Sequence, residues 1–571
     1  MAKIKQLIEC VPNFSEGRDM NVINQITDEI RNSAGVRLLD VDPGEATNRT
    51  VVTFVGEPDA VMEAAFRAVR KASQLIDMRQ HHGAHPRSGA TDVLPLVPVA
   101  GITLEECAEL ARKLAKRLAD ELEIPCYCYE AAALKPERKN LAVVRRGEYE
   151  AIPERINDPA EAPDFGARPF DEGVARTGCT NVGARDFLIA VNYNLNTTST
   201  RRANAIAFDV REKGRPAREG NPITGKVKLD ENGKKIMIPG TLKGTKGIGW
   251  YIEEYGIAQV SMNITNINAT PLHVAFDEVC RCAQNRGVRV TGTEIVGLVP
   301  ERTLLEAGRY FLEKQQRSTG IPKEDIIKIA IKSLGLSDLK PFNPREKVIE
   351  YLLEDENGDD KALVKMTVKG FAEETSRESP APGGGSVAAY MGALGAALGT
   401  MVANLSSHKP GWDDRWEEFS RWADKGQALS DELLVLVDED TRAFNKIMEA
   451  FGLPKKTDED KRLRSEAIQA ATLFATQVPL QTMQAAFGAF ELCQAMAEHG
   501  NPNSVSDAGV GALAARAAVL GAGLNVKINA ASLKDRETAD KMIAEAEQLI
   551  AEAQKKEAEI IGIVERKINE A

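Results

Sequence analysis

The chain has few aromatic residues and few histidines, and its cysteines form no paired motif. Phe, Trp and Tyr together make up 5% of the 571 residues, and six histidines are present. The eight cysteines are scattered without a C-x-x-C pair, which excludes a zinc ribbon and a dithiol redox site. We therefore expect unpaired thiols in a reducing, cytoplasmic compartment.

An excess of positive charge is also missing. The chain has 73 Lys and Arg against 84 Asp and Glu, a net charge of -11, so nothing global attracts nucleic acid or anionic membranes. One charge-free stretch, residues 379–408, is long enough to span a membrane. Ala, Gly and Ser dominate it, and Pro380 and Pro382 interrupt its start. A small-residue helix packed in a soluble bundle is favoured, so we expect neither a membrane nor a nucleic-acid partner.

The first half alternates short apolar runs with helical periodicity. Strands are predicted near residues 4–11, 36–42 and 50–56, followed by a helix over 58–76. Thr103 and Glu106 have the spacing of a capping box. The pattern restarts at residues 187–195, with a helix near 199–213 and strands near 257–264 and 288–298, which indicates a second α/β unit.

The pattern changes after Pro344, because no β pattern appears beyond it. The periodicity predicts a helical bundle, with helices near residues 365–376, 386–405, 413–449, 458–475, 477–499, 505–530 and 536–569.

A basic stretch separates two strands of the second α/β unit. Residues 211–246 contain ten Lys or Arg against four Asp or Glu, and the run from Asp230 to Gly233 predicts a β-hairpin turn. A solvated excursion is the simpler interpretation of this charge.

Three of the six histidines, His81, His82 and His85, lie in the five residues HHGAH, followed by Arg87. Their spacing matches no H-E-x-x-H or Cys/His metal motif, so general acid–base work by one histidine is the stronger hypothesis. A metal site and a structural histidine cluster remain alternatives.

Upstream, Asp42 ends a predicted strand and Arg49 follows in a polar loop. Asp42 could orient an imidazole, and Arg49 or Arg87 could bind a substrate carboxylate through two hydrogen bonds. The alternative is a solvated aspartate and surface arginines.

In the helical half, Gly383, Gly384 and Gly385 precede Ser386 at a predicted helix start. Backbone N–H groups there favour a polar or anionic ligand, although the phosphate-loop pattern is absent. Further along, three consecutive acids, residues 438–440, lie on one helix. Most such acids face solvent, but one that faces a pocket would have a raised pKa and could act as an acid.

These motifs resemble, in order and over nearly the whole chain, the formimidoyltransferase-cyclodeaminase family. The N-terminal half carries ECVPNFSEG, LLDVD with TNRTV, LID followed by HPR, RRGEYEAIP, APDFG, GARDFLIAVN and KGIGWY. The C-terminal half carries APGGGSVAA, MGALGAALG, VDEDTRAF and NSVSDAGVGA.

The resemblance implies an α/β plus all-α fold. Residues 1–181 and 182–330 would be two α/β sandwich subdomains of a formiminotransferase, 331–348 a linker, and 349–571 an all-α helical cyclodeaminase. It also implies a homo-oligomer, an octameric ring of dimers. Residues 216–240 look inserted relative to the mammalian members.

The implied activity moves the formimino group of N-formimino-L-glutamate to tetrahydrofolate, and then closes the product to 5,10-methenyltetrahydrofolate with loss of ammonia. Tetrahydrofolate is expected in polyglutamylated form, and no metal is expected. Two alternatives remain: a glutamate formyltransferase on the same fold, and a non-catalytic helical scaffold in the C-terminal half.

The resemblance assigns His85 as the transferase proton carrier and Asp440 as the cyclodeaminase proton donor. Asp42, Arg49 and Arg87 would support the transferase site. The implied folate-binding residues are Gly166, Ala167, Arg168, Pro169, Phe170, Gly173, Gly178, Thr180, Gly383, Gly384, Gly385, Ser386 and Asp507. We further hypothesise that the inserted basic segment attracts the polyglutamate tail of folate.

Overall fold

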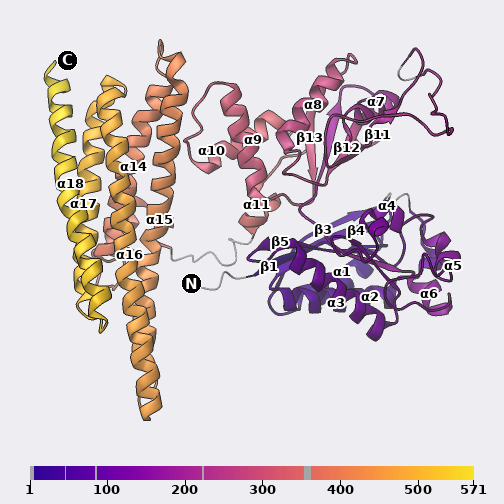
Figure 1. Cartoon of the computed structure of the whole chain (residues 1–571), viewed down its shortest axis with the longest axis horizontal. Coiled ribbons are helices and arrows are strands. Elements are labelled where there is room, and N and C mark those ends of the chain that lie inside the picture. Colours follow the sequence, from indigo (N-terminus) through magenta and orange to yellow (C-terminus); the bar gives the residue numbers. More distant parts are fainter. Residues whose placement is uncertain (1–5, 46, 84–85, 222–223, 353–361, 571) are drawn as a thin grey trace. The chain divides into compact units, whose positions relative to one another are not determined.

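The structure, a computed structural model, describes residues 6–45, 47–83, 86–221, 224–352 and 362–570 (Figure 1). Contacts divide the chain into two compact units. The first comprises Met1–Thr303 with Leu334–Asp355, and the second comprises Leu304–Ser333 with Glu356–Ala571.

The first unit contains a seven-stranded sheet in which the path β1-β4-β2-β5-β7-β6 also carries β3 on β4. Three helices, α1, α2 and α3, pack on one face, where alternate strand residues such as Ile8 and Cys10 join the core. The capping box of Thr103 and Glu106 is confirmed at the start of α3. The elements are β1 (Leu7–Cys10), β2 (Asn13–Phe14), α1 (Met20–Arg31), β3 (Val36–Gly44), β4 (Arg49–Gly56), α2 (Pro58–Leu75), β5 (Thr91–Ala100), α3 (Leu104–Leu122), β6 (Cys126–Glu130), α4 (Leu141–Val144), α5 (Ile152–Arg155), α6 (Glu172–Thr177) and β7 (Thr180–Ala184).

A second, antiparallel sheet in the same unit has the order β11-β12-β8-β13. Helix α7 lies so close to β11 that a Cβ on Gly249 would be 2.1 Å from the Asn204 nitrogen, and the Asn204 side chain bonds the Gly249 backbone. The predicted second α/β unit is confirmed. Its elements are β8 (Ile189–Leu195), α7 (Thr200–Val210), β11 (Thr245–Ile252), β12 (Ile257–Ile264), α8 (Leu272–Gln284) and β13 (Val290–Val296).

The predicted hairpin in the basic stretch is also confirmed. Strands β9 (Arg215–Pro216) and β10 (Met237–Ile238) pair, and a bridge between Leu229 and Lys235 closes the turn at Asp230. Residues 228–239 are all exposed, and so is Lys226. The arm formed by residues 226–239 therefore projects into solvent.

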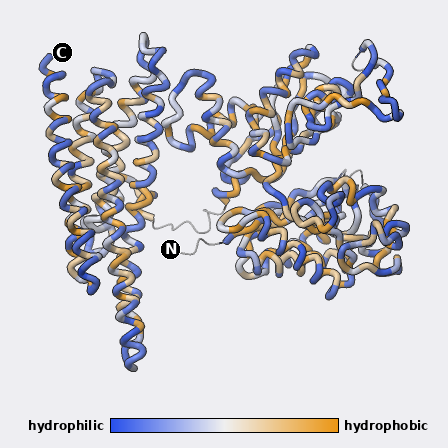
Figure 2. Tube along the Cα trace, in the orientation of Figure 1, coloured by the Kyte–Doolittle hydropathy of each residue, from blue (hydrophilic) through white to orange (hydrophobic). Residues whose placement is uncertain are grey.

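The second unit is a helical bundle in which hydrophobic and hydrophilic residues alternate along the helices (Figure 2). Glycines permit close helix packing: a Cβ on Gly395 would lie 2.8 Å from the Gly511 carbonyl oxygen. The helices are α9 (Glu301–Lys314), α10 (Lys323–Leu334), α13 (Val368–Thr375), α14 (Gly384–Ser407), α15 (Trp416–Gly452), α16 (Asp458–His499), α17 (Val505–Ala530) and α18 (Arg536–Glu570). Helix α9 begins, and α10 ends, in the first unit.

One helix prediction is wrong. The two helices expected near residues 458–475 and 477–499 are a single helix, α16, with Pro479 inside it. Val478, Pro479 and Leu480 are buried in the bundle. Packing on both sides of the proline therefore offsets the hydrogen bond that it removes.

Two helical segments, Gly384–Ser407 and Pro502–Ala530, are long and apolar enough to cross a membrane. In their most apolar windows, 61% and 50% of the residues are buried inside the protein. Helices α14 and α17 also pack against each other, which favours the interpretation of the charge-free stretch as a bundle helix.

The subdomain divisions at residues 181, 330 and 348 remain proposals. The first falls within β7, and the proposed linker 331–348 includes the end of α10 and the short helix α11 (Pro344–Lys347).

Candidate functional site

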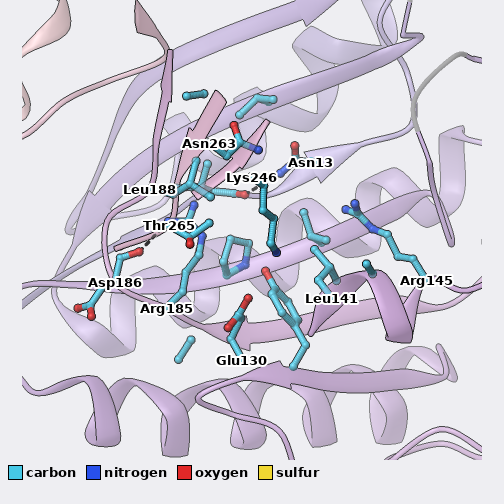
Figure 3. Close-up of a pocket in the computed structure, with 18 of the residues that line it drawn as sticks. Asn13, Glu130, Leu141, Arg145, Arg185, Asp186, Leu188, Lys246, Asn263 and Thr265 are labelled. Carbon is cyan, nitrogen blue, oxygen red and sulfur yellow. Dashed lines mark hydrogen bonds between the residues drawn. The ribbon is translucent and has the colours of Figure 1, made fainter. Parts of the chain in front are cut away.

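A cleft of about 940 Å³ opens on the face of the first sheet opposite α1, α2 and α3 (Figure 3). Strand alternation explains this: Ile8 and Cys10 point into the core, whereas Glu9 between them lines the cleft. The second sheet contributes Lys246, and the connection between the sheets contributes Arg185.

The turn that carries His81 and His82, called the histidine turn below, lies beside the loop before Arg49, as expected. Asn48 donates its side-chain N–H to the His82 carbonyl at 3.0 Å, and its own carbonyl lies 2.8 Å from His81 Nε2. A Cβ on Gly83 would lie 2.1 Å from the Thr47 carbonyl oxygen, so the turn needs glycine there.

His81 is buried, and burial lowers its pKa, which favours the neutral imidazole. His85 lies outside the described residues. Its neighbour Pro86 lines the cleft.

The supporting residues do not all reach the cleft. Asp42 and Arg49 line it, and Arg49 Nε donates to Asn13 Oδ1 at 2.7 Å. Burial, together with nearby Asp40, raises the pKa of Asp42. Burial also lowers the pKa of Arg49 to about 10, which leaves it charged at neutral pH.

Arg87 is engaged elsewhere. Its guanidinium pairs with Glu148 at 3.0 Å and Glu150 at 2.6 Å, and its Nε lies 3.4 Å from His81 Nδ1. Arg87 therefore braces the histidine turn and does not line the cleft.

The predicted folate segment of the transferase half does not line the cleft either. Gly166 packs against Ala119, Arg168 pairs with Glu123 and Asp171, and Gly178 lies against the Ser88 carbonyl. Among the residues that the structure describes, the cleft lining contains none of Gly166, Ala167, Arg168, Pro169, Phe170, Gly173, Gly178 and Thr180.

Sequence reasoning missed Glu9, Arg185 and Lys246 as site residues. Glu9 is 4% exposed, and burial raises its pKa to about 7. A glutamate in a buried apolar strand was the one available signal for it. Arg185 and Lys246 lie within two of the family motifs, GARDFLIAVN and KGIGWY, but only the fold shows that they line the same cleft.

The charges of the cleft favour ligands with carboxylates. Arg145 is neutralised by Asp92 at 2.5 Å, but Arg185 and Lys246 face Glu130, whose pKa burial raises. A raised pKa weakens the compensation that Glu130 gives these two cations, and cations of this kind bind carboxylates.

The helical unit holds a second candidate site. Asp440, on α15, is half-buried, and its Oδ2 accepts hydrogen bonds from the Ser386 N–H at 2.9 Å and Oγ at 3.1 Å. A Cβ on Gly385 would lie 2.0 Å from Asp440 Oδ1. Burial raises the pKa of Asp440, whereas the two hydrogen bonds from Ser386 lower it by a smaller amount.

The neighbouring acids have other roles. Asp438 Oδ1 accepts from the Leu363 N–H at 2.7 Å, and Glu439 pairs with Arg442. Of the three, Asp440 is the one that lies beside Ser386.

Asp507 is not at this site within one chain. Helices α14 and α17 run antiparallel, because Gly384 lies near Asn525 whereas Asn501, just before α17, donates to Ser406 at 2.8 Å. Asp507 is in the first turn of α17. It therefore lies at the Ser406 end of α14, about 30 Å along the helix from Ser386.

No group of three or more His, Cys, Asp or Glu within the described ranges could hold a metal ion.

Family models match both halves. The N-terminal subdomain of the formiminotransferase domain matches residues 7–185, the formiminotransferase domain residues 190–354, and formiminotransferase-cyclodeaminase residues 367–548. The chain is 42% identical to the mouse (Mus musculus) formimidoyltransferase-cyclodeaminase over 562 residues, which is 98% of this chain and 99% of that relative.

Two single-function relatives match parts of the chain. A glutamate formimidoyltransferase of Streptococcus pyogenes serotype M1 is 40% identical over 55% of this chain and 94% of its own length. A methenyltetrahydrofolate cyclohydrolase of Methylorubrum extorquens is 39% identical over 36% of this chain and 98% of its own length.

Burial of Glu9 predicts a specific pH dependence of stability. Its pKa rises from 4.5 to about 7 on folding, so between these values the unfolded state releases a proton that the folded state keeps. The wild type should lose at most about 3 kcal/mol of stability as pH rises through this window. Glu9→Gln should abolish that loss, measured by thermal unfolding at pH 5 and pH 8. The exposed Glu109→Gln is the control, and identical pH dependence in wild type and Glu9→Gln would contradict the prediction.

Proposed function

Because the chain belongs to the formimidoyltransferase-cyclodeaminase family, a family of bifunctional enzymes of histidine breakdown and folate one-carbon metabolism, we propose that it catalyses both reactions in sequence. The substrates are N-formimino-L-glutamate and tetrahydrofolate, and the products are glutamate, 5,10-methenyltetrahydrofolate and ammonia.

The first reaction belongs to the cleft of the first unit. N5 of tetrahydrofolate attacks the formimino carbon, the bond from that carbon to the glutamate nitrogen breaks, and a proton moves from N5 to the leaving nitrogen. His85 carries this proton and Asp42 assists it. The supporting observation is that Asp42 lines the cleft together with cations suited to carboxylate substrates, Arg49, Arg185 and Lys246.

The second reaction belongs to the Asp440 site. N10 attacks the formimino carbon and loses its proton, after which the carbon–nitrogen bond to the departing amine breaks. The amine leaves as ammonia once Asp440 has protonated it. A carboxyl whose pKa is raised by burial is suited to this role. Gly385 lies beside it, and together with Gly383 and Gly384, which precede it at the start of α14, it would contact the folate.

Two substitutions should separate the activities. His85→Ala should lower formimino transfer by about 100-fold or more, and Asp440→Ala should lower ammonia release by a similar factor while 5-formimidoyltetrahydrofolate accumulates. The measurement follows methenyl absorbance, ammonia and glutamate from the same mixture. His82→Ala is the control in the histidine turn.

Other outcomes of the same assay contradict the proposal. Use of N-formyl-glutamate in place of the formimino donor would favour a glutamate formyltransferase, and no turnover with either donor would favour a scaffold role.

Hydrolysis of methenyltetrahydrofolate is a second candidate activity, favoured by the similarity to a cyclohydrolase. Wild-type protein that converts 5,10-methenyltetrahydrofolate to the 10-formyl compound faster than the Asp440→Ala variant would support it.

We also propose that the folate carries a polyglutamate tail, which the exposed arm attracts. The arm ends near Gly240, six residues before Lys246 in the cleft, and it presents four exposed lysines, Lys226, Lys228, Lys234 and Lys235. Six residues span at most about 20 Å, so the arm begins close to the cleft.

Replacing these four lysines with Ser should lower the preference for polyglutamyl over monoglutamyl folate by about tenfold, since exposed charge pairs contribute a few tenths of a kcal/mol each. The ratio of kcat/KM for the two folates is the measurement. Lys455, Lys456, Lys461 and Lys541, exposed in the helical unit, provide the matched control. An unchanged ratio would sink the arm hypothesis.

We propose that the chain forms a homo-oligomer, an octameric ring of dimers, through the uncharged face of α14 and α17. On α14, half-buried or exposed apolar residues recur every three or four positions: Val387, Met391, Leu394, Leu398, Met401 and Leu405. On α17, Leu524 and Ile528 are each 70% exposed. Apolar surface of this extent is typical of interfaces.

Leu524→Glu combined with Ile528→Glu should therefore reduce the particle mass measured by light scattering, because burying two carboxylates in an apolar interface is costly. Val435→Glu, at a 60% exposed position on α15, is the control and should leave the mass unchanged. Retention of full mass in the double variant would contradict the assignment of this face.

A cytoplasmic location completes the proposal. It is supported by eight free cysteines, seven of which are buried thiols.

A further inference from the structure

We propose that Ser386 is a positioning residue that determines which oxygen of Asp440 carries the proton used in the second reaction. This inference rests on the proposed acid role of Asp440, and it assigns Ser386 a role beyond lining the folate site.

The hydrogen bonds distinguish the two carboxyl oxygens. Ser386 donates both its backbone N–H, at 2.9 Å, and its Oγ, at 3.1 Å, to the same atom, Oδ2 of Asp440. A carboxyl oxygen that accepts two hydrogen bonds is a poor place for a proton. The proton therefore resides on Oδ1.

The lack of a side chain at Gly385 makes room for Oδ1. Any side chain there would place its Cβ 2.0 Å from Oδ1, which would displace the carboxyl. Gly385 is buried, whereas Asp440 is half-buried. In the proposed reaction Oδ1, which takes neither of the two Ser386 hydrogen bonds, gives its proton to the departing nitrogen and is left as the carboxylate oxygen afterwards.

The start of helix α14 supports the resulting carboxylate. Ser386 occupies the third position of α14, where a backbone N–H has no partner within the helix, and Asp440 supplies that partner from α15. The positive end of the helix dipole adds to this effect. Both interactions stabilise the charged form and counter burial, which favours the neutral form.

Other charged groups around Asp440 are engaged elsewhere or lie on neighbouring elements. Helix α14 carries no Asp, Glu, Lys or Arg, and neither do residues 472–486 of α16, which pack beside this part of α15. Among the described residues, the other charges near this end of the bundle include Asp438 on the Leu363 N–H, Glu439 with Arg442, Lys446 over Phe474, Lys527 with Glu547, Lys369 with Glu373, Arg377 with Glu374, Glu378 and Lys365. The Ser386 contacts are therefore the main influence that opposes burial.

The test is the pH profile of cyclodeamination by the full chain supplied with 5-formimidoyltetrahydrofolate. Activity that needs protonated Asp440 falls as pH rises through the Asp440 pKa. Ser386→Ala removes the Oγ donor, which raises the pKa of Asp440, so the alkaline limb should move upward by about one pH unit. Ser386→Thr, which keeps the hydroxyl, should restore the wild-type limb.

The control is Ser430→Ala. Ser430 is buried on α15, and its Oγ lies 3.4 Å from the Ala393 carbonyl oxygen on α14. The Ser430→Ala variant therefore loses a comparable hydroxyl that does not bond Asp440. Its pH profile should match the wild type. Formimino transfer by the same samples reports whether each variant is folded.

Two results separate this inference from the proposal on which it rests. If Asp440→Asn is inactive but the limb of Ser386→Ala does not move upward, the role of Ser386 is wrong and the acid role stands. If Asp440→Asn releases ammonia at the wild-type rate, the acid role itself is wrong. If Ser386→Ala unfolds, Ser386→Cys takes its place, because a thiol is a weaker hydrogen-bond donor than a hydroxyl. The alkaline limb of Ser386→Cys should then move upward by less than about one pH unit. An unmoved limb in that variant would equally overturn the inference.

Discussion

Both candidate sites depend on a close approach that only a residue without a side chain permits. A Cβ on Gly83 would lie 2.1 Å from the Thr47 carbonyl oxygen, and one on Gly385 would lie 2.0 Å from Asp440 Oδ1. The first approach joins the histidine turn to the loop that carries Arg49. The second brings a carboxyl from α15 onto the start of α14. Because neither contact tolerates an added carbon, the arrangement of functional groups follows from the backbone at these two positions.

Desolvation then raises the pKa of the carboxyls at these sites. Glu9 is buried in the cleft, Asp440 is half-buried in the bundle and Asp42 is exposed at the cleft, and in each case desolvation is the main cause of a raised carboxyl pKa. A carboxyl with a raised pKa can act as an acid, so a chain with only six histidines has other candidate proton carriers. The raised pKa of Glu130 likewise weakens its compensation of Arg185 and Lys246.

Periodicity predicted most of the fold, because strand and helix patterns depend on neighbouring residues. The two α/β units, the hairpin at Asp230 and the helical bundle are confirmed. The break expected near Pro479 was wrong, because burial of the surrounding turn outweighs the local cost of proline. Arg87 was one of two arginines suggested for a substrate carboxylate, and in the structure it pairs with Glu148 and Glu150, whose position no local pattern reveals.

The sequence by itself determined the class of each element, the division into an α/β part and a helical part, and the family to which the chain belongs. It also singled out a histidine turn and a run of three acids as candidates. Only the tertiary structure decided which side chains share a site and which oxygen of Asp440 accepts the Ser386 hydrogen bonds. The physical reason is that hydrogen bonding and burial join residues far apart in the chain: Ser386 and Asp440 are 54 positions apart, and their contact depends on how two helices pack.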